Sequence, residues 1–152
     1  MAENGKKIIV VNKRARFDYE ISETLEAGLV LQGTEVKSLR DGRVSLQDAY
    51  ADVQNGEVFL LNAHINPYDY GNRFNHEPER PRKLLLHRRE IKRLIGKTQE
   101  RGLTLIPTRM YFTHGKAKIE LGLAKGKKQY DKRQELKRRS AQRDIERAIR
   151  GE

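Results

Sequence analysis

The segment AYADVQNGEVFLLNAHI, residues 49–65, decides the fold because it predicts a tight antiparallel hairpin. Two stretches rich in strand formers, Ala49–Val53 and Val58–Ile65, flank the dipeptide Asn55-Gly56. Asn-Gly favours a two-residue type I′ turn, in which both central residues take a positive φ angle. The segment therefore predicts two paired strands, and Asn66-Pro67 is expected to end the second.

A second hairpin is predicted near the end of the apolar part of the chain. The stretches Leu103–Phe112 and Lys116–Ala124 flank His114-Gly115. Pro107 lies inside the first of these strands and lacks the N–H that a central strand position needs. We therefore expect Pro107 at an edge or at a β-bulge.

The region before the first hairpin predicts one strand and one short helix. Tyr19–Leu31 is rich in strand formers, and Gly28 within it suggests a bulge or sharp bend. Thr34 is expected to cap a helix that ends at Asp41-Gly42.

The region between the hairpins predicts a loop and a longer helix. Asp69–Pro81 has no apolar periodicity, so we expect a long exposed loop. Gly96 and Gly102 are the possible helix ends. One apolar face at a spacing of three to four residues is formed by Leu84, Leu85, Ile91, Leu94 and Ile95.

These elements favour a mainly β fold. Antiparallel strands with two inserted helices fit a small oligonucleotide-binding-type β-barrel with flanking helices. An open antiparallel sheet packed on helices is the alternative. We expect two parts, a folded β-barrel body of residues 1–124 and a basic C-terminal tail of residues 125–152.

The charge of the chain predicts a polyanionic partner. The 152 residues carry 32 Lys and Arg against 21 Asp and Glu, a net charge of +11. Residues 1–16, 17–64, 65–124 and 125–152 contribute +4, −6, +7 and +6 respectively. An acidic section between basic ones indicates a folded body with a basic face and a basic arm, rather than uniform solvation.

Several classes of site are excluded by composition and motif. The chain has no Cys, so disulfides, thiolate metal sites and cysteine nucleophiles are ruled out. The four His lie far apart, and no phosphate-binding loop or GxSxG motif is present. We expect no metal, no cofactor and no enzyme activity, with a nuclease as the remaining catalytic alternative. No apolar run is long enough for a membrane span, and a cytoplasmic location is expected.

The tail has the pattern of a helix that forms on binding. Asp131 with Gln134 resembles a capping box. From there, one helix face carries a stripe of Arg139, Arg143, Arg147 and Arg150. A helix with so many charges is marginal alone, so we expect it to be disordered in the free protein and helical when phosphates neutralise the stripe.

Five blocks of sequence resemble the SsrA-binding protein family (small protein B), the bacterial partners of transfer-messenger RNA (tmRNA) in ribosome rescue. The blocks are residues 12–15, 26–28, 33–40, 82–87 and 125–133. The resemblance implies that one face of an oligonucleotide-binding-type barrel holds the tRNA-like domain of tmRNA. It also implies a stalled 70S ribosome with its small-subunit rRNA as a second partner, elongation factor Tu as an indirect one through charged tmRNA, and a monomeric protein.

The resemblance also implies the binding residues. Asn12, Glu26, Leu85 and His87 fall on RNA-binding positions, although the family often has Asn in place of His87. The expected tmRNA-binding set is Asn12, Lys13, Arg14, Glu26, Lys37, Arg40, Lys83, Leu85, His87, Lys125, Lys127 and Lys128. The expected decoding-centre and mRNA-channel set is Tyr130, Asp131, Lys132, Arg133, Arg139, Arg143, Ile145, Arg147, Ile149 and Arg150; some members have His in place of Tyr130.

Alternatives remain open at this point. Leu85 is equally compatible with an ordinary core position, and Glu26 with a residue that organises basic neighbours. For the whole chain, the alternative function is a structural ribosomal protein. Such a component would be present on every 70S particle, whereas a rescue factor would bind free tmRNA and stalled particles.

Overall fold

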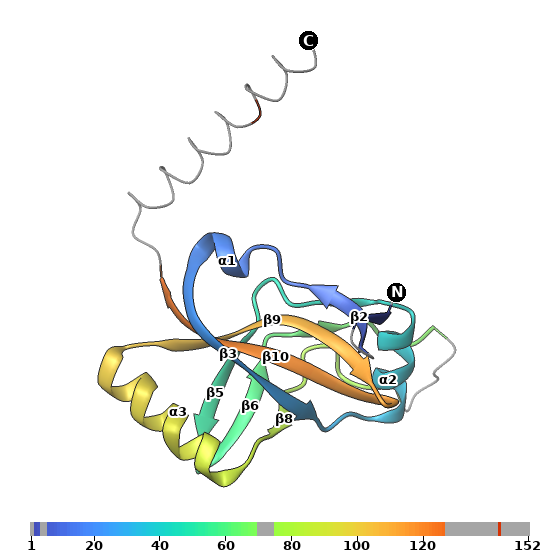
Figure 1. Ribbon diagram of the computed structural model, residues 1–152. Coiled ribbons are helices and arrows are strands. Elements are labelled where there is room, and N and C mark those ends of the chain that lie inside the picture. Colours follow the sequence, from blue (N-terminus) through green and yellow to red (C-terminus); the bar gives the residue numbers. More distant parts are fainter. Residues whose placement is uncertain (1, 4–5, 70–74, 127–142, 144–152) are drawn as a thin grey trace.

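The computed structural model describes residues 2–3, 6–69, 75–126 and 143 (Figure 1). Its strands are β1 (Ala2–Glu3), β2 (Lys6–Val11), β3 (Tyr19–Leu29), β4 (Val44–Ser45), β5 (Tyr50–Gln54), β6 (Glu57–Leu61), β7 (His64–Ile65), β8 (Arg82–Leu85), β9 (Thr104–Thr113) and β10 (Lys116–Gly126). Its helices are α1 (Ala15–Asp18), α2 (Gly33–Arg40) and α3 (Arg88–Arg101). The prediction of a mainly β fold with inserted helices is confirmed.

Eight strands form one antiparallel sheet in the order β1-β2-β9-β10-β3-β8-β6-β5. β5 also pairs with β9 through Ala51 and Leu105. The pairings that start at β9 therefore pass through β10, β3, β8, β6 and β5 and return to β9. Because β9 also pairs with β2, the N-terminal strands extend the sheet beyond this ring.

Both predicted hairpins are present, and the positive φ angles predicted for the turn at Asn55-Gly56 are confirmed. Asn55 and Gly56 have φ angles of 53° and 77° between β5 and β6. His114 and Gly115 have φ angles of 51° and 75° between β9 and β10. These are the positive angles that a type I′ turn requires.

Pro107 lies at a bulge, as predicted. Arg109 faces Glu120 and Pro107 faces Leu121, so Thr108 is the extra residue in β9. Of the bulge or sharp bend expected at Gly28, the bulge is wrong, because Gly28 pairs in register with Lys118 of β10. The register of β3 against β10 shifts instead at Ser22, because Leu123 faces Glu23 and Ala124 faces Ile21.

The glycine at position 28 serves a close approach between strands. Gly28 pairs with Leu85 of β8, and a Cβ added at Gly28 would lie 3.3 Å from the Leu85 Cβ. This is tighter than almost all real contacts of a Cβ atom, so a larger residue would push β8 away from β3.

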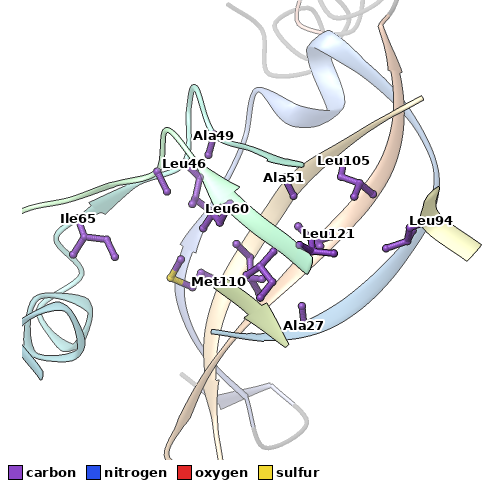
Figure 2. Close-up of a cluster of buried hydrophobic side chains, with 14 of the residues drawn as sticks. Ala27, Leu46, Ala49, Ala51, Leu60, Ile65, Leu94, Leu105, Met110 and Leu121 are labelled. Atoms are coloured by element: carbon purple, nitrogen blue, oxygen red, sulfur yellow. The ribbon is translucent and has the colours of Figure 1, made fainter. Parts of the chain in front are cut away.

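The core lies inside the ring of strands. Strand alternation buries Ile119, Leu121 and Leu123 of β10 completely. Figure 2 shows Leu60, Met110 and Leu121 gathered between the strands, with Leu94 pointing in from α3. Each fully buried Leu side chain contributes about 1.5–3 kcal/mol relative to exposure.

The helix predictions need three corrections. The longer helix begins at Arg88, and Leu84 and Leu85 belong to β8 instead. Gly96 lies inside this helix, whereas Gly102 ends it with a left-handed φ of 63°. α2 is capped by Gln32 rather than Thr34, whose hydroxyl contacts the ring of His76 at 2.9 Å.

Some elements, among them β2, α1 and β8, are additional to the predicted set. The short apolar run in β2 and the four residues of α1 are too short to show periodicity in sequence. The expected loop over residues 69–81 has no helix or strand in its described part, but His76 within it is buried. None of the described helices is long and apolar enough to cross a membrane.

Candidate nucleic-acid interface

A groove of about 600 Å³ brings together three of the predicted binding residues. Glu26 comes from β3, Leu85 from the end of β8, and His87 from the residue that caps α3. The pairing of Gly28 with Leu85 sets β3 beside β8 and so places these side chains around one opening. Two separate blocks of sequence, residues 26–28 and 82–87, thus converge on one surface.

Leu85 is an exposed apolar residue rather than part of the core. Strand alternation turns Leu84 inward, at 2% exposure, and Leu85 outward, at 55%. The alternative of an ordinary core position is therefore excluded. An exposed Leu on the wall of a groove can contact the apolar face of a base or a ribose.

His87 stands at the start of α3, next to Leu85. Its backbone N–H donates to Glu90 Oε1 at 3.0 Å, which fixes the turn from β8 into the helix. The side chain of His87 lines the groove. The imidazole can therefore stack on a base or exchange hydrogen bonds with it.

Glu26 is a groove carboxylate that accepts a hydrogen bond from the hydroxyl of Tyr111. Among the ion pairs found in the described part of the chain, none involves Glu26. The alternative in which Glu26 organises basic neighbours has no ion pair to support it within these residues. A carboxylate repels phosphate, so its natural RNA partner is an N–H donor on a base edge.

Lys118 is a groove residue that the sequence did not single out. It lies on β10 opposite Gly28 and lines the groove beside Glu26 and Leu85. It also lines a neighbouring hollow of about 300 Å³, whose walls include Val36, Phe112 and Lys116. The alternation of Lys116 and Lys118 with the buried Ile119 is the signal that could have placed both lysines on the outer face.

Asn12 lies elsewhere, and the fold uses its side chain. The amide of Asn12 is buried at 8% exposure and donates to the carbonyls of Leu46 at 3.1 Å and Pro107 at 2.9 Å. This geometry favours an anchoring role, in which Asn12 fixes the start of the segment that carries Lys13 and Arg14.

Lys125 lies at the opposite end of the β3–β10 ladder from the groove, and Lys13 and Arg14 directly precede α1, which leads into that end of β3 (Figure 1). Lys13 is exposed, and Arg14 Nε lies 3.7 Å from Asp18 Oδ2 within α1. Lys125 is exposed and faces Glu20 across the ladder. These cations therefore form a second basic region rather than a part of the groove.

The remaining predicted cations of the body are spread over other elements. Lys37 and Arg40 lie on α2, and the Lys37 ammonium lies 5.5 Å from the ring centre of Tyr68. Lys83 Nζ pairs with Glu57 Oε1 at 3.1 Å on the outer face of β6 and β8. The structure does not bring these three residues into the groove.

A buried ion-pair network links α2 to β8. Glu35 accepts from Arg80 at 2.5 Å and from Arg82 at 2.6 Å, and the side chains of Glu35 and Arg82 are both fully buried. Arg82 Nη1 also donates to the carbonyl of Ala63 at 2.7 Å. The sequence pattern did not predict this network. It joins the family-like blocks 33–40 and 82–87, and it anchors β8 at Arg82, three residues before Leu85.

The pKa of Glu35 reflects this network. Burial alone would raise the pKa of Glu35. Hydrogen bonds from Arg80, a backbone N–H and Arg82 outweigh burial and hold the pKa of this carboxyl below its ordinary value. Glu35 is therefore ionised at neutral pH and has a structural role.

Most predicted tail residues lie outside the described residues. These are Lys127, Lys128, Tyr130, Asp131, Lys132, Arg133, Arg139, Ile145, Arg147, Ile149 and Arg150. Arg143 is described and is exposed. In the described part of the chain, no group of three or more His, Cys, Asp or Glu side chains could hold a metal ion.

The comparisons with known proteins agree on one family. A family model described as "SmpB protein" matches residues 9–151. A relative from Geobacillus thermodenitrificans, named "SsrA-binding protein", is 63% identical over 150 residues and covers 99% of this chain and 97% of its own. A relative of the same name from Desulforudis audaxviator is 60% identical over 151 residues and covers 99% of both chains.

A solved structure shares the fold as well. It is described as "tmRNA-SmpB: a journey to the center of the bacterial ribosome" and is 53% identical to this chain, with a TM-score of 0.67. The match covers 79% of this chain and 85% of the solved one. A family model that spans nearly the whole sequence, with relatives at 60% identity or more, shows that the chain belongs to the SmpB protein family.

Proposed function

We propose that this protein is an RNA-binding adaptor that holds the tRNA-like domain of tmRNA and delivers it to stalled ribosomes. The observation that carries the proposal is the convergence of Glu26, Leu85 and His87 on one groove beside Lys118. These side chains supply an acceptor, an apolar face, a ring and a cation, which suit an unstacked or looped RNA surface. The names of the relatives and the ribosomal setting of the solved structure support the same conclusion.

The body has the form that such a role needs. The strand pairings that return to β9 support an oligonucleotide-binding-type barrel, with α3 and α2 flanking it. The basic region of Lys13, Arg14 and Lys125 lies away from the groove and provides a second surface for RNA phosphates. One protein surface would then bind tmRNA while another contacts rRNA, in the cytoplasm and without catalysis.

The tail completes the proposed division of labour. The basic tail, expected over residues 125–152, enters the decoding site and the mRNA channel left empty on a stalled ribosome. Its first two residues are the last two of β10. Tyr130, Asp131, Lys132 and Arg133 lie at its start, and the Arg stripe follows. A monomer suffices for this arrangement, and elongation factor Tu joins through the charged tmRNA.

Replacing Leu85 with Ser is expected to weaken binding of the tRNA-like domain by about 10-fold to 100-fold. This is the loss of burying one Leu side chain against RNA, about 1.5–3 kcal/mol. The melting temperature should stay unchanged, because Leu85 is 55% exposed in the free protein. A filter-binding titration and a thermal melt measure the two effects.

Val11→Ser is the matched control, because Val11 is 51% exposed on β2 and lines none of the groove. It should bind like the unchanged protein. Equal affinity losses for both variants would contradict the assignment of the groove.

A chain that ends at Gly126, where β10 ends, is expected to keep most of its affinity for the tRNA-like domain, although it lacks Lys127 and Lys128 of the expected binding set. The groove and its supporting strands are all present in such a chain. The same protein should fail to support tagging on stalled ribosomes, since it has no tail. A gel-shift titration measures binding, and a tagging reaction measures activity on stalled ribosomes. Complete loss of binding would refute the assignment of tmRNA binding to the body.

A further inference from the structure

Tyr111 links β9, on the other side of β10 from β3, to the groove. It lies on β9, with 1% of its surface exposed, and faces Lys118 of β10 in the register. Its hydroxyl donates to Oε2 of Glu26 on β3, so the side chain reaches across the whole width of β10. The contact joins residues 85 positions apart in sequence.

The ring of Tyr111 is contacted by two cations. Lys6 Nζ lies 4.7 Å from the ring centre, and the Arg109 guanidinium carbon lies 5.4 Å from it. Such cation–π contacts favour one ring position. The hydroxyl is therefore presented to Glu26 by a side chain with little freedom of its own.

The charge of Glu26 is not neutralised by its hydrogen bond from Tyr111, because the hydroxyl is a neutral donor. Glu120 lies directly opposite Glu26 in the β3–β10 register, a pairing of like charges. Arg109 Nε at 3.1 Å and Thr108 Oγ1 at 2.6 Å both donate to Glu120 Oε2. Arg109 thus donates to Glu120, whereas Glu26 accepts from the neutral hydroxyl of Tyr111.

We propose that Tyr111 is a positioning residue for RNA recognition: it fixes one oxygen of Glu26 so that the other accepts a hydrogen bond from a base-edge N–H in the groove. This role rests on the proposed function, and the group that donates to Glu26 is an N–H on the edge of an RNA base. The donors available on RNA bases are the amino and imino groups of their exposed edges, which single-stranded loops present.

The hydroxyl of Tyr111 stays a donor under all physiological conditions. Burial, and after it the hydrogen bond to Glu26, raise the pKa of Tyr111 above its ordinary value. The proton therefore remains on Tyr111, and Glu26 stays the acceptor.

The test is Tyr111→Phe in the full-length protein, titrated with a transcript of the tRNA-like domain at several salt concentrations. Affinity should fall roughly tenfold, the order expected for losing a hydrogen bond to a charged group. The slope of log affinity against log salt should not change, because neither Tyr111 nor Glu26 contacts phosphate. Lys118→Ala should instead lower that slope by about 0.7–0.9 if it neutralises one phosphate.

A double-mutant cycle isolates the positioning role. Tyr111→Phe added to Glu26→Ala should cost no further affinity, because the carboxylate that Tyr111 positions is already gone. Glu26→Asp keeps the charge but shortens the side chain away from the hydroxyl, and should lose about as much affinity as Tyr111→Phe. Additive losses in the cycle, or unchanged affinity for Tyr111→Phe or Glu26→Asp, would overturn the proposal.

Ser38→Ala controls for the loss of a buried hydroxyl as such. Ser38 is fully buried and donates to the carbonyl of Asn66 at 2.7 Å, away from the groove. It should lower the melting temperature as Tyr111→Phe does, yet leave affinity unchanged. Failure of the unchanged protein to bind the transcript would refute the proposed function itself, whereas normal binding with an unaffected Tyr111→Phe variant refutes only the positioning role.

Discussion

Glu35→Ala is expected to destabilise the protein by about 3–5 kcal/mol, because it leaves Arg82 as a buried and uncompensated charge. Both side chains are fully buried, and Arg80 loses the same partner. For a chain of this size, the melting temperature should fall by roughly 6–20 °C. A thermal melt followed by circular dichroism measures the shift.

Two variants test the cause. Glu57→Ala removes an ion pair whose partners, Lys83 and Glu57, are 44% and 49% exposed, so it should cost under about 1 kcal/mol. The pair Glu35→Leu with Arg82→Met removes both charges, and should recover much of the lost stability. A single Glu35→Ala variant as stable as the Glu57→Ala control would show that the buried network is dispensable.

The same network predicts the response to acid. The pKa of Glu35 is lowered in the folded state, so its ionised form favours folding above the ordinary carboxyl pKa. That contribution is fully present at neutral pH and is lost as pH falls from the ordinary value through the lowered one. The Glu35→Leu and Arg82→Met double variant should therefore lose less stability on acidification than the unchanged protein.

Replacing Lys132 and Arg133 together with Ala is expected to abolish tagging on stalled ribosomes. The sequence predicts that Asp131 begins a helix. Its carboxylate would accept hydrogen bonds from backbone N–H groups of the first turn, which have no partners within the helix. The two adjacent cations would then pair with rRNA phosphates at the decoding centre. Affinity for tmRNA should stay within about threefold, a difference under 1 kcal/mol. A tagging reaction and a gel shift measure the two outcomes.

The matched control removes two positive charges elsewhere. Arg89 and Lys92 are exposed on α3, so Arg89→Ala with Lys92→Ala gives the same net charge and should support tagging. Replacing Ile145 and Ile149 with Pro tests the helix itself, because each proline costs about 3 kcal/mol inside a helix. Normal tagging by the proline variant would mean that the tail acts as an extended polycation.

The parts of the fold that could be predicted are those governed by short-range geometry. The positive φ angles at Asn55-Gly56, the hairpin at His114-Gly115 and the bulge at Pro107 follow from the residues themselves. The boundary between β8 and α3 could not be found in this way. Leu84 and Leu85 fit the spacing of the helix face, and only pairing with β3 and β6 makes them a strand.

The candidate site was predictable in its residues but not in its connections. Family resemblance pointed to Glu26, Leu85 and His87, and the fold brings them together. Tyr111 and Lys118 join the site only through strand register, which a single sequence does not reveal. Asn12 and Glu35 also lie in family-like blocks, residues 12–15 and 33–40, yet their side chains hold the fold together.

The two walls of the groove differ in how firmly the backbone holds them. β3 is joined to β10 from Tyr19 to Gly28, whereas within the described residues it pairs with β8 at Gly28–Leu85 and Leu29–Leu84, followed by one hydrogen bond from the Val30 N–H to the Lys83 carbonyl. β8 is therefore held less by β3 than by its pairing with β6 and by the buried ion pair of Arg82 with Glu35. Glu26 and Leu85 thus take their positions from different parts of the molecule: Glu26 from the long ladder between β3 and β10, and Leu85 from the buried charges that join β8 to α2.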